Sequence, residues 1–193
     1  APLAHRFGMA EVKAELEDLA FKFLEPEEYA SLAHQVAAKR AEREEMVAAL
    51  QGPLEQELTR ASIEAADVSG RPKHLWSIWQ KMRRRNTLFE AIYDMMALRV
   101  IVKTVPDCYH VLGIIHSLWK PIPGKFKDYI GLPKENMYQS IHTAVIGPYG
   151  ERIEIQIRTH EMHKIAEEGI AAHWKYKEGK VLEEADDKRF TWL

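Results

Sequence analysis

Residues 151–159 read ERIEIQIRT, and the alternation in this stretch decides how the second half of the chain folds. Side chains on a β-strand point to opposite faces in turn, so the isoleucines share one face while Glu154, Gln156 and Arg158 share the other. We therefore predict a strand over 151–158 with one apolar and one polar face. A carboxylate, an amide and a guanidinium together suit a phosphorylated nucleotide and a cation, and they are poor choices for a hydrophobic core.

The flanking sequence extends this strand into a sheet. Residues 141–147 form a second predicted strand, and GPYG at 147–150 is typical of a hairpin turn. The short and largely apolar run 97–102 predicts a buried strand. The chain is thus expected to have an α+β fold in which helices flank a mixed central sheet. The helices are expected over 72–85, from Pro106 onward and over 160–176, and a basic loop rich in proline and glycine is expected over 121–133.

The first third of the chain has helical periodicity. One apolar helix face is predicted from the spacing of Val12, Leu16, Leu19, Ala20 and Phe23. A second helix is predicted to start at Pro26 and to be kinked or broken at Gly52-Pro53. Composition changes near residues 67–70, so we predict a boundary between a helical segment over 1–67 and a second domain over 68–193.

Composition narrows the class of protein. The 193 residues carry a net charge of −2, which argues against a non-specific coat for DNA, and 46% are apolar, which is enough for a core. Cys108 is the single cysteine, so an intrachain disulfide is excluded and a reducing cytosol is expected. No run of the sequence approaches the roughly 18 apolar residues that span a bilayer. We expect a cytoplasmic protein without a membrane partner.

Two carboxylates are candidate metal ligands. Asp94 comes just before the predicted strand 97–102, and Glu154 lies in the middle of the strand 151–158. Hard cations such as Mg²⁺ take oxygen ligands and bridge one or two carboxylates to substrate phosphates. The alternative is structural, in which Asp94 caps a turn and Glu154 pairs with Arg152 or Arg158.

Positive charges surround the same region. Lys73 and Lys81 lie along one side of the helix predicted there, with Arg71 just before it. Lys125 and Lys127 add charge in the basic loop. Lysine and arginine clamps of this kind stabilise a transferring phosphoryl group by electrostatics.

Residues 134–142 read KENMYQSIH and gather cationic, amide, aromatic and imidazole groups within nine positions. Together with the polar strand face, this aromatic platform suits a nucleotide. Residues 160–163, HEMH, lack the spacing of a zinc-protease helix, so we interpret them as a charged first helical turn. Trp76 and Trp79 are interpreted as packing residues.

The motifs of the second half occur in a fixed order: GRPKH at 70–74, YDMMALRV at 93–100, CYHVLG at 108–113, WKP at 119–121, FKDYI at 126–130, NMYQSIH at 136–142, EIQIRT at 154–159 and AAHW at 171–174. As an ordered set they resemble the long RelA/SpoT-type (p)ppGpp synthetases of the bacterial stringent response. The N-terminal segment, with APLAHR at 1–6 and ELEDLA at 15–20, is similar to the last helices of that family's N-terminal hydrolase domain.

The resemblance implies a nucleotidyltransferase-like fold that transfers the β,γ-pyrophosphate of ATP to the 3′-hydroxyl of GDP or GTP. It implies that Asp94 binds Mg²⁺, with Mn²⁺ as the alternative, and that Glu154 contacts the metal or activates the hydroxyl. On the ATP side, Arg71 and Arg99 would sandwich the adenine, while Lys73 and Lys81 would meet the phosphates. On the GDP or GTP side, Tyr138 would stack on the guanine, and the acceptor would be surrounded by Lys125, Lys127, Lys134, Asn136, His142 and Gln156.

The same resemblance describes the chain as a fragment. The family's hydrolase uses a His-Asp pair, and no His-Asp dipeptide occurs here, so synthesis without hydrolysis is expected. The loop KFKD at 125–128 is of the basic type found in bifunctional members, with lysine in place of arginine. The longer protein is expected to associate with the ribosome and tRNA through domains missing here. Two alternatives stay open: a catalytically silent nucleotide-sensing or interaction fragment, and an RNA-binding domain that uses Arg83–Arg85.

Overall fold

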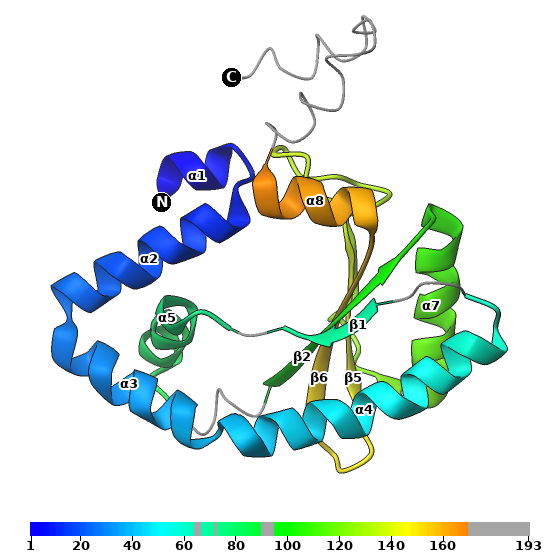
Figure 1. Cartoon of the computed structure of the whole chain (residues 1–193), viewed down its shortest axis with the longest axis horizontal. Helices are drawn as coiled ribbons and strands as arrows, with labels where there is room; N and C mark the ends of the chain where they lie inside the picture. The colour runs from blue at the N-terminus through cyan, green and yellow to red at the C-terminus, as the bar shows by residue number, and fades with distance from the viewer. Residues whose placement is uncertain (64–66, 72, 90–94, 170–193) are drawn as a thin grey trace, which may run out of the picture.

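The computed structural model describes residues 1–63, 67–71, 73–89 and 95–169 of the chain (Figure 1). Helices precede and flank a sheet, so the predicted α+β fold is confirmed. In chain order the elements are α1 (Pro2–Arg6), α2 (Ala10–Leu24), α3 (Pro26–Ala38), α4 (Arg40–Arg60), β1 (Asp67–Gly70), α5 (Leu75–Arg85), β2 (Met95–Val102), α7 (Val105–Leu118), β3 (Lys120–Pro121), β4 (Lys127–Asp128), β5 (Ile141–Ile146), β6 (Arg152–Thr159) and α8 (His160–Glu168).

A mixed sheet of six strands forms the centre of the second half. Its order is β1-β2-β6-β5-β3, and β4 also pairs with β5. β2 and β6 run parallel, whereas the other pairs are antiparallel. The predicted hairpin is confirmed, because β5 and β6 pair on either side of a turn in which Gly150 adopts a φ of +83°.

The apolar face of the sheet packs against α4 and α7 and forms the main core. Ile153, Ile155 and Ile157 are each 0% exposed, as the alternation of the strand predicts. Burying one such side chain contributes roughly 1.5–3 kcal/mol. A slip of one residue would exchange these isoleucines for the polar residues between them, so the core fixes the register of β6 and thereby the direction of its polar side chains.

Helix α4 belongs to this core, although it lies within the segment predicted to be a separate helical part. Leu50, Leu54 and Leu58 pack into the same cluster as the sheet. Of the kink or break predicted at Gly52-Pro53, the break does not occur, because α4 continues through Pro53. The helical segment is interrupted at Lys39 instead, between α3 and α4. Proline has no backbone N–H, so the helix loses one hydrogen bond at Pro53. The burial of leucines on both sides of the proline offsets the free energy lost with that bond. The division at 67/68 stays a prediction.

A second apolar cluster joins α2, α3 and α5. Phe21 of α2 is 1% exposed, and its ring centroid lies 4.9 Å from that of Trp79 and 5.7 Å from that of Trp76. The packing role predicted for the two tryptophans is therefore confirmed. Arg83 covers the other side of this cluster, with its guanidinium 4.7 Å from the Trp79 ring and 3.7 Å from a Glu28 carboxylate oxygen.

The helix predicted from the apolar spacing is confirmed as α2, and its apolar face is exposed. Phe23 is 88% exposed, and Val12, Leu16 and Leu19 are exposed as well. Helices α3 and α5 pack on the side of Phe21 instead. The hydrophobic spacing of α2 was read correctly as helical, but the face that is buried depends on helices from elsewhere in the chain.

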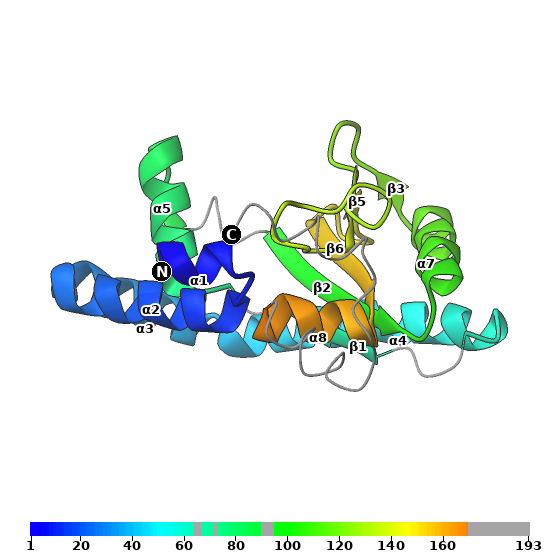
Figure 2. The ribbon, with the colours of Figure 1, turned by 90° about the horizontal axis from the view of Figure 1, so that it is seen from above.

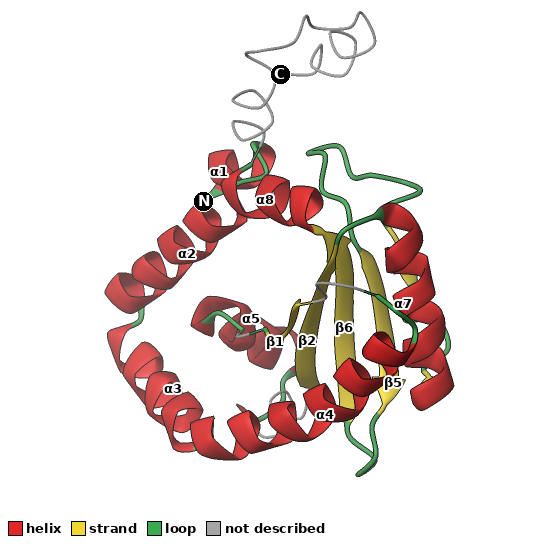
Figure 3. Ribbon diagram, turned by 45° about the vertical axis from the view of Figure 1, so that its right-hand side comes forward, coloured by secondary structure: helices red, strands yellow, loops and turns green. Residues whose placement is uncertain are grey.

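The polar face of the sheet lies opposite the face that α4 and α7 cover. Figure 3 shows α7 on one side of the sheet and α5 on the other, and the view from above in Figure 2 separates the same two helices across the sheet. Helices α1 to α4 form an arc around α5 (Figure 1), and α8 contacts both α2 and the strands β2 and β6. Among the described helices, none combines the length and the apolar character that a membrane span requires.

Candidate functional site

Strand pairing places five polar side chains in one row across the open face of the sheet. Arg99 of β2 lies opposite Gln156 of β6, and Gln156 lies opposite His142 of β5. The row is extended by Ser69 of β1, opposite Arg99, and by Lys127 of β4, opposite His142. Directly paired residues share a face of the sheet, so these side chains are neighbours although they come from distant parts of the chain.

Glu154 lies in the next row of the same face. Its partners are Ala97 on β2 and Ala144 on β5. Two alanines leave the carboxylate without large neighbours on either side, so a ligand can approach it over the sheet. This is the only part of the described open face where a carboxylate stands between two such small side chains.

The cations predicted to meet ATP gather close to Glu154. The backbone N–H of Arg71 donates to the carbonyl oxygen of Ala97, 2.7 Å away, which fixes Arg71 next to the row of Glu154. Burial lowers the pKa of Lys73 to about 8, the negative charge of Glu154 opposes this effect, and the positive charges of Lys81 and Arg71 add to it. The charges of Glu154, Lys81 and Arg71 are therefore close enough to Lys73 to change its pKa. A phosphate placed among them would meet three cations.

An aromatic and cationic cluster lies at the other end of the row. The Lys134 ammonium is 4.6 Å from the ring centroid of Tyr129 and 4.9 Å from that of Tyr138. The Tyr138 hydroxyl is hydrogen-bonded to Nε2 of His142 at 2.8 Å. The Tyr138 N–H donates to Oδ1 of Asn136 at 3.3 Å, which orders the backbone of the loop. The structure thus brings together most of the residues that the sequence assigned to GDP or GTP.

The imidazole of His142 is neutral at pH 7. Its pKa is lowered to about 4, first by burial and then by the positive charge of Lys134 and of further cations around it. A neutral imidazole has one donor and one acceptor nitrogen and carries no charge. His142 is therefore suited to a hydrogen bond with a base or a hydroxyl and is a poor partner for phosphate.

Helix α1 forms one wall of a cavity next to this cluster. The cavity has a volume of about 960 Å³, and its other wall is the loop over 129–136. The Asn136 side-chain N–H donates to the carbonyl oxygen of His5 at 3.2 Å and ties the two walls together. Arg6 and Lys134 both line the cavity. No local pattern could predict this contact, because α1 and the loop are separated by more than half of the chain.

Arg158 is not open to a ligand. Its side chain is 2% exposed, and its Nη2 lies 2.7 Å from a carboxylate oxygen of Glu167 and 2.7 Å from Nδ1 of His163. The alternative that paired Arg158 with Glu154 does not describe this arrangement. Residues 160–163 form the first turn of α8, as predicted, and His163 in that turn contacts Arg158 through Nδ1. Its spacing of four residues from Glu167 is the signal that could have indicated a shared helix side.

The structure leaves two predicted site residues without an assigned place in the site. Asp94 lies outside the described residues. Lys125 is exposed in the turn before β4, whereas Lys127 is held by pairing with β5. Across the described ranges there is no group of three or more histidine, cysteine, aspartate or glutamate side chains that could hold a metal ion. Glu154 is the described carboxylate that lies near Lys73, and a single carboxylate there fits an ion held mainly by substrate phosphates.

The fold and this face define a mixed α+β domain with two groups of nucleotide-suited side chains, one on each side of a central carboxylate. Residues 70–181 match a protein-family model described as the region found in RelA / SpoT proteins. The chain belongs to the RelA/SpoT family.

Curated relatives of the chain are named for two different activities, a pyrophosphokinase and a pyrophosphohydrolase. The chain is 49% identical over 193 residues to a GTP pyrophosphokinase of Myxococcus xanthus, covering 100% of this chain and 25% of the relative. It is 52% identical over 194 residues to a guanosine-3′,5′-bis(diphosphate) 3′-pyrophosphohydrolase of Aquifex aeolicus, covering 100% of this chain and 27% of the relative. The chain thus spans about a quarter of the length of these relatives, and their names do not say which activity this quarter carries.

One similar solved structure matches most of this chain and most of its own length. The small alarmone synthetase 1 from Bacillus subtilis, bound to its product pppGpp, is similar with a TM-score of 0.52 and 26% identity. The similarity covers 83% of this chain and 87% of that chain. Almost the whole of that synthetase therefore corresponds to the fold described above.

Proposed function

We propose that this chain carries a (p)ppGpp synthetase site that transfers the pyrophosphate of ATP to the 3′-hydroxyl of GDP or GTP. The observation that carries the proposal is the strand register, which sets two groups of ligand-suited side chains on either side of Glu154. The product-bound Bacillus subtilis synthetase supports it, because that protein has the same fold over nearly its whole length. A transfer between two nucleotides needs two adjoining sites with the reacting groups between them.

On the donor side, Lys73 and Lys81 would hold the ATP phosphates while Arg71 and Arg99 contact the adenine. Arginine guanidinium planes stack well on aromatic rings, whereas lysine acts as a compact point charge for phosphate. The lowered pKa of Lys73 reflects burial next to two cations, and a bound polyphosphate would raise it again. Binding of ATP would therefore relieve the charge repulsion among these residues.

On the acceptor side, Tyr138 would stack on the guanine. The Lys134 ammonium lies over that ring at 4.9 Å, so the base must replace it or use the other face of the ring. A cation over an exposed aromatic ring is worth about 0.5–1 kcal/mol, whereas stacking of a base is worth roughly 1–3 kcal/mol. Stacking therefore prevails, and Lys134 becomes available for the acceptor phosphates.

The remaining acceptor residues are proposed to contact different parts of the nucleotide. His142 and Gln156 lie in the row nearest to Glu154 and would bond the sugar or the base. Asn136 orders the loop beneath Tyr138. Lys127, and Lys125 in the adjoining turn, would meet the phosphates.

Catalysis would consist mainly of positioning and neutralisation of charge, as in phosphoryl transfer generally. Glu154 stands where the two nucleotides meet and would hold a metal ion or accept the proton of the 3′-hydroxyl. Asp94 is proposed as a second metal ligand, and Mg²⁺, or Mn²⁺ in its place, would supply neutralisation of the phosphate charge when bound. The two lysines 73 and 81 would hold the transferred group in line.

The domain division and the setting of the longer protein are also proposals. Residues 68–193 would form the synthetase domain, and 1–67 would be the end of a preceding helical domain whose last helix, α4, completes the core. The longer protein would act in the cytoplasm and contact the ribosome and tRNA through parts outside this chain. These proposals are supported by the family membership.

The direct test is to incubate the purified chain with ATP, Mg²⁺ and either GDP or GTP and to separate the products by ion-exchange chromatography. AMP should form in step with a guanosine tetra- or pentaphosphate, and the faster acceptor gives the preference. ATP and GDP binding without AMP or alarmone would instead support the silent nucleotide-sensing fragment. RNA binding that weakens steeply with salt, without nucleotide binding, would favour the role of Arg83–Arg85.

A further inference from the structure

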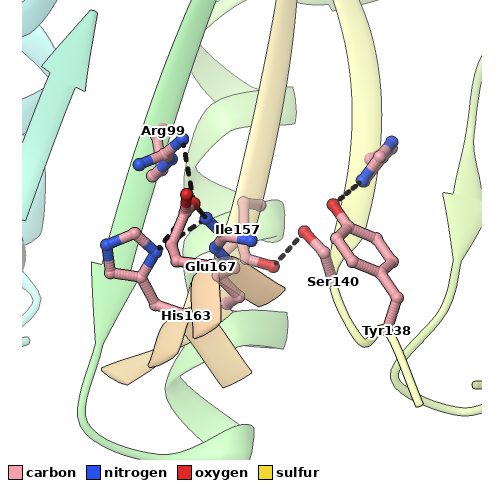
Figure 4. A network of polar contacts seen from close by, with 8 residues as sticks. Arg99, Tyr138, Ser140, Ile157, His163 and Glu167 are labelled. Atoms are coloured by element: carbon pink, nitrogen blue, oxygen red, sulfur yellow. Dashed lines mark hydrogen bonds and ion pairs between the residues drawn. The ribbon is translucent and has the colours of Figure 1, made fainter. Parts of the chain in front are cut away.

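Glu167 of α8 connects two arginines of the open sheet face. One of its carboxylate oxygens lies 2.7 Å from Nη2 of Arg158 and 3.5 Å from Nη2 of Arg99. Nδ1 of His163 lies 3.5 Å from the same oxygen. Figure 4 shows the Glu167 carboxylate between Arg99 and His163, where α8 meets the strands.

Arg99 is partly exposed to a ligand, whereas Arg158 is buried. Arg158 is buried to 2% exposure and has a second close partner in His163. Arg99 keeps 21% of its side chain exposed and lies in the row beside Gln156. Among the described residues, Glu167 is the ion-pair partner of Arg99, and Nε of neither arginine has a hydrogen-bond partner there.

The carboxylate is held firmly in place. Helix α8 is anchored by Met162, Ile165 and Ala166, which are buried. Its first turn is capped by Thr159, whose hydroxyl accepts from the N–H of Met162 at 3.2 Å. The position of Glu167 is therefore set by the helix and not by a flexible loop.

We propose that Glu167 is a positioning residue that orients Arg99 for the donor nucleotide. A carboxylate binds the N–H edge of a guanidinium and leaves its planar face available for an aromatic ring. Without Glu167, Arg99 would face the buried positive charge of Arg158 on the neighbouring strand, and it would turn away from the row. This inference rests on the proposed function, because that function assigns the adenine of ATP to Arg99.

The test is Glu167→Gln, which keeps the size of the side chain and removes its charge. We expect the KM for ATP to rise about fivefold, the scale of a partly exposed ion pair, while the KM for GDP stays within about twofold. Glu167→Asp should recover part of the loss. The matched control is Glu168→Gln, because Glu168 is the exposed neighbour on the same helix and should leave both constants unchanged.

A double-variant cycle separates positioning from general loss of structure. Arg99→Gln should raise the KM for ATP, and adding Glu167→Gln to it should have little further effect, because the residue to be positioned is gone. Equal changes in the KM for ATP and GDP, or independent effects in the double variant, would overturn the proposal. Thermal unfolding of each variant shows whether the fold is retained.

Failure of the proposed function would be recognised separately. If the wild-type chain makes no alarmone, the same variants are compared by calorimetric binding of a non-hydrolysable ATP analogue. Weaker analogue binding in Glu167→Gln, with Glu168→Gln equal to wild type, would uphold the positioning role without synthesis. Equal binding in all variants would reject it.

Discussion

Replacing His142 with glutamine should change the way in which the stability of the domain depends on pH. In the folded protein, burial and the positive charge of Lys134 lower the pKa of His142 from 6.5 to about 4. The unfolded chain therefore takes up a proton at this site as the pH falls through 6.5, whereas the folded chain does so only near pH 4. The stability contributed by the neutral imidazole is complete above pH 7 and is lost as the pH falls between 6.5 and 4.

The magnitude follows from the two pKa values. Their difference corresponds to about 3 kcal/mol in total, and linkage places about 2 kcal/mol of this loss between pH 7 and pH 5. Such a change is a large part of the 5–15 kcal/mol that is typical of the free energy of unfolding of a domain. It should therefore be resolved easily by urea unfolding.

The assay compares the free energy of unfolding of wild type, His142→Gln and His34→Gln at pH 7, 6 and 5. His34 is exposed on α3 and serves as the matched control. The stability advantage of wild type over His142→Gln should shrink by about 2 kcal/mol from pH 7 to pH 5, whereas the difference from His34→Gln should stay constant. Parallel pH profiles for wild type and His142→Gln, or an NMR titration of His142 near pH 6.5, would refute the reasoning.

Three other predictions test the two halves of the site. Glu154→Gln should abolish alarmone formation without changing the melting temperature, and a normal rate in the chromatographic assay would exclude a central role for this carboxylate. Tyr138→Ala should weaken GDP binding about five- to a hundredfold through loss of stacking while ATP binding is nearly unchanged in calorimetry, and an equal loss of both would indicate misfolding. Affinity for ATP should fall as the pH rises through about 8, where Lys73 loses its charge, and Lys73→Arg should remove this dependence if Lys73 binds phosphate.

Much of the sheet could be predicted because its signal is local. The alternation around Ile155 gives both the strand and the face that is buried, and the turn at 147–150 gives its antiparallel partner. The same alternation places Glu154 and Gln156 on the open face. Both remain there in the structure, so the pattern was sufficient for this part of the site.

The remainder depends on contacts between distant residues. The sequence could not tell that Glu167 would cover Arg158, because the strand pattern only says that Arg158 faces away from the isoleucines. The burial of Phe21 on α2 could not be predicted for the same reason, since it depends on packing against α3 and α5. Pro53 would end an isolated helix, but here the leucines around it are packed against a sheet that lies later in the chain.

The parallel pairing of β2 and β6 determines when the site can form during protein synthesis. The whole segment 103–151 lies between these neighbouring strands, because parallel strands cannot be joined by a tight turn. During synthesis, the residues assigned to ATP leave the ribosome first, but β2 gains its central neighbour only after residue 159 has been added. A nascent or truncated chain that ends before β6 would therefore carry the donor-side cations without the strand that aligns them, and an early-terminated product should not sequester ATP.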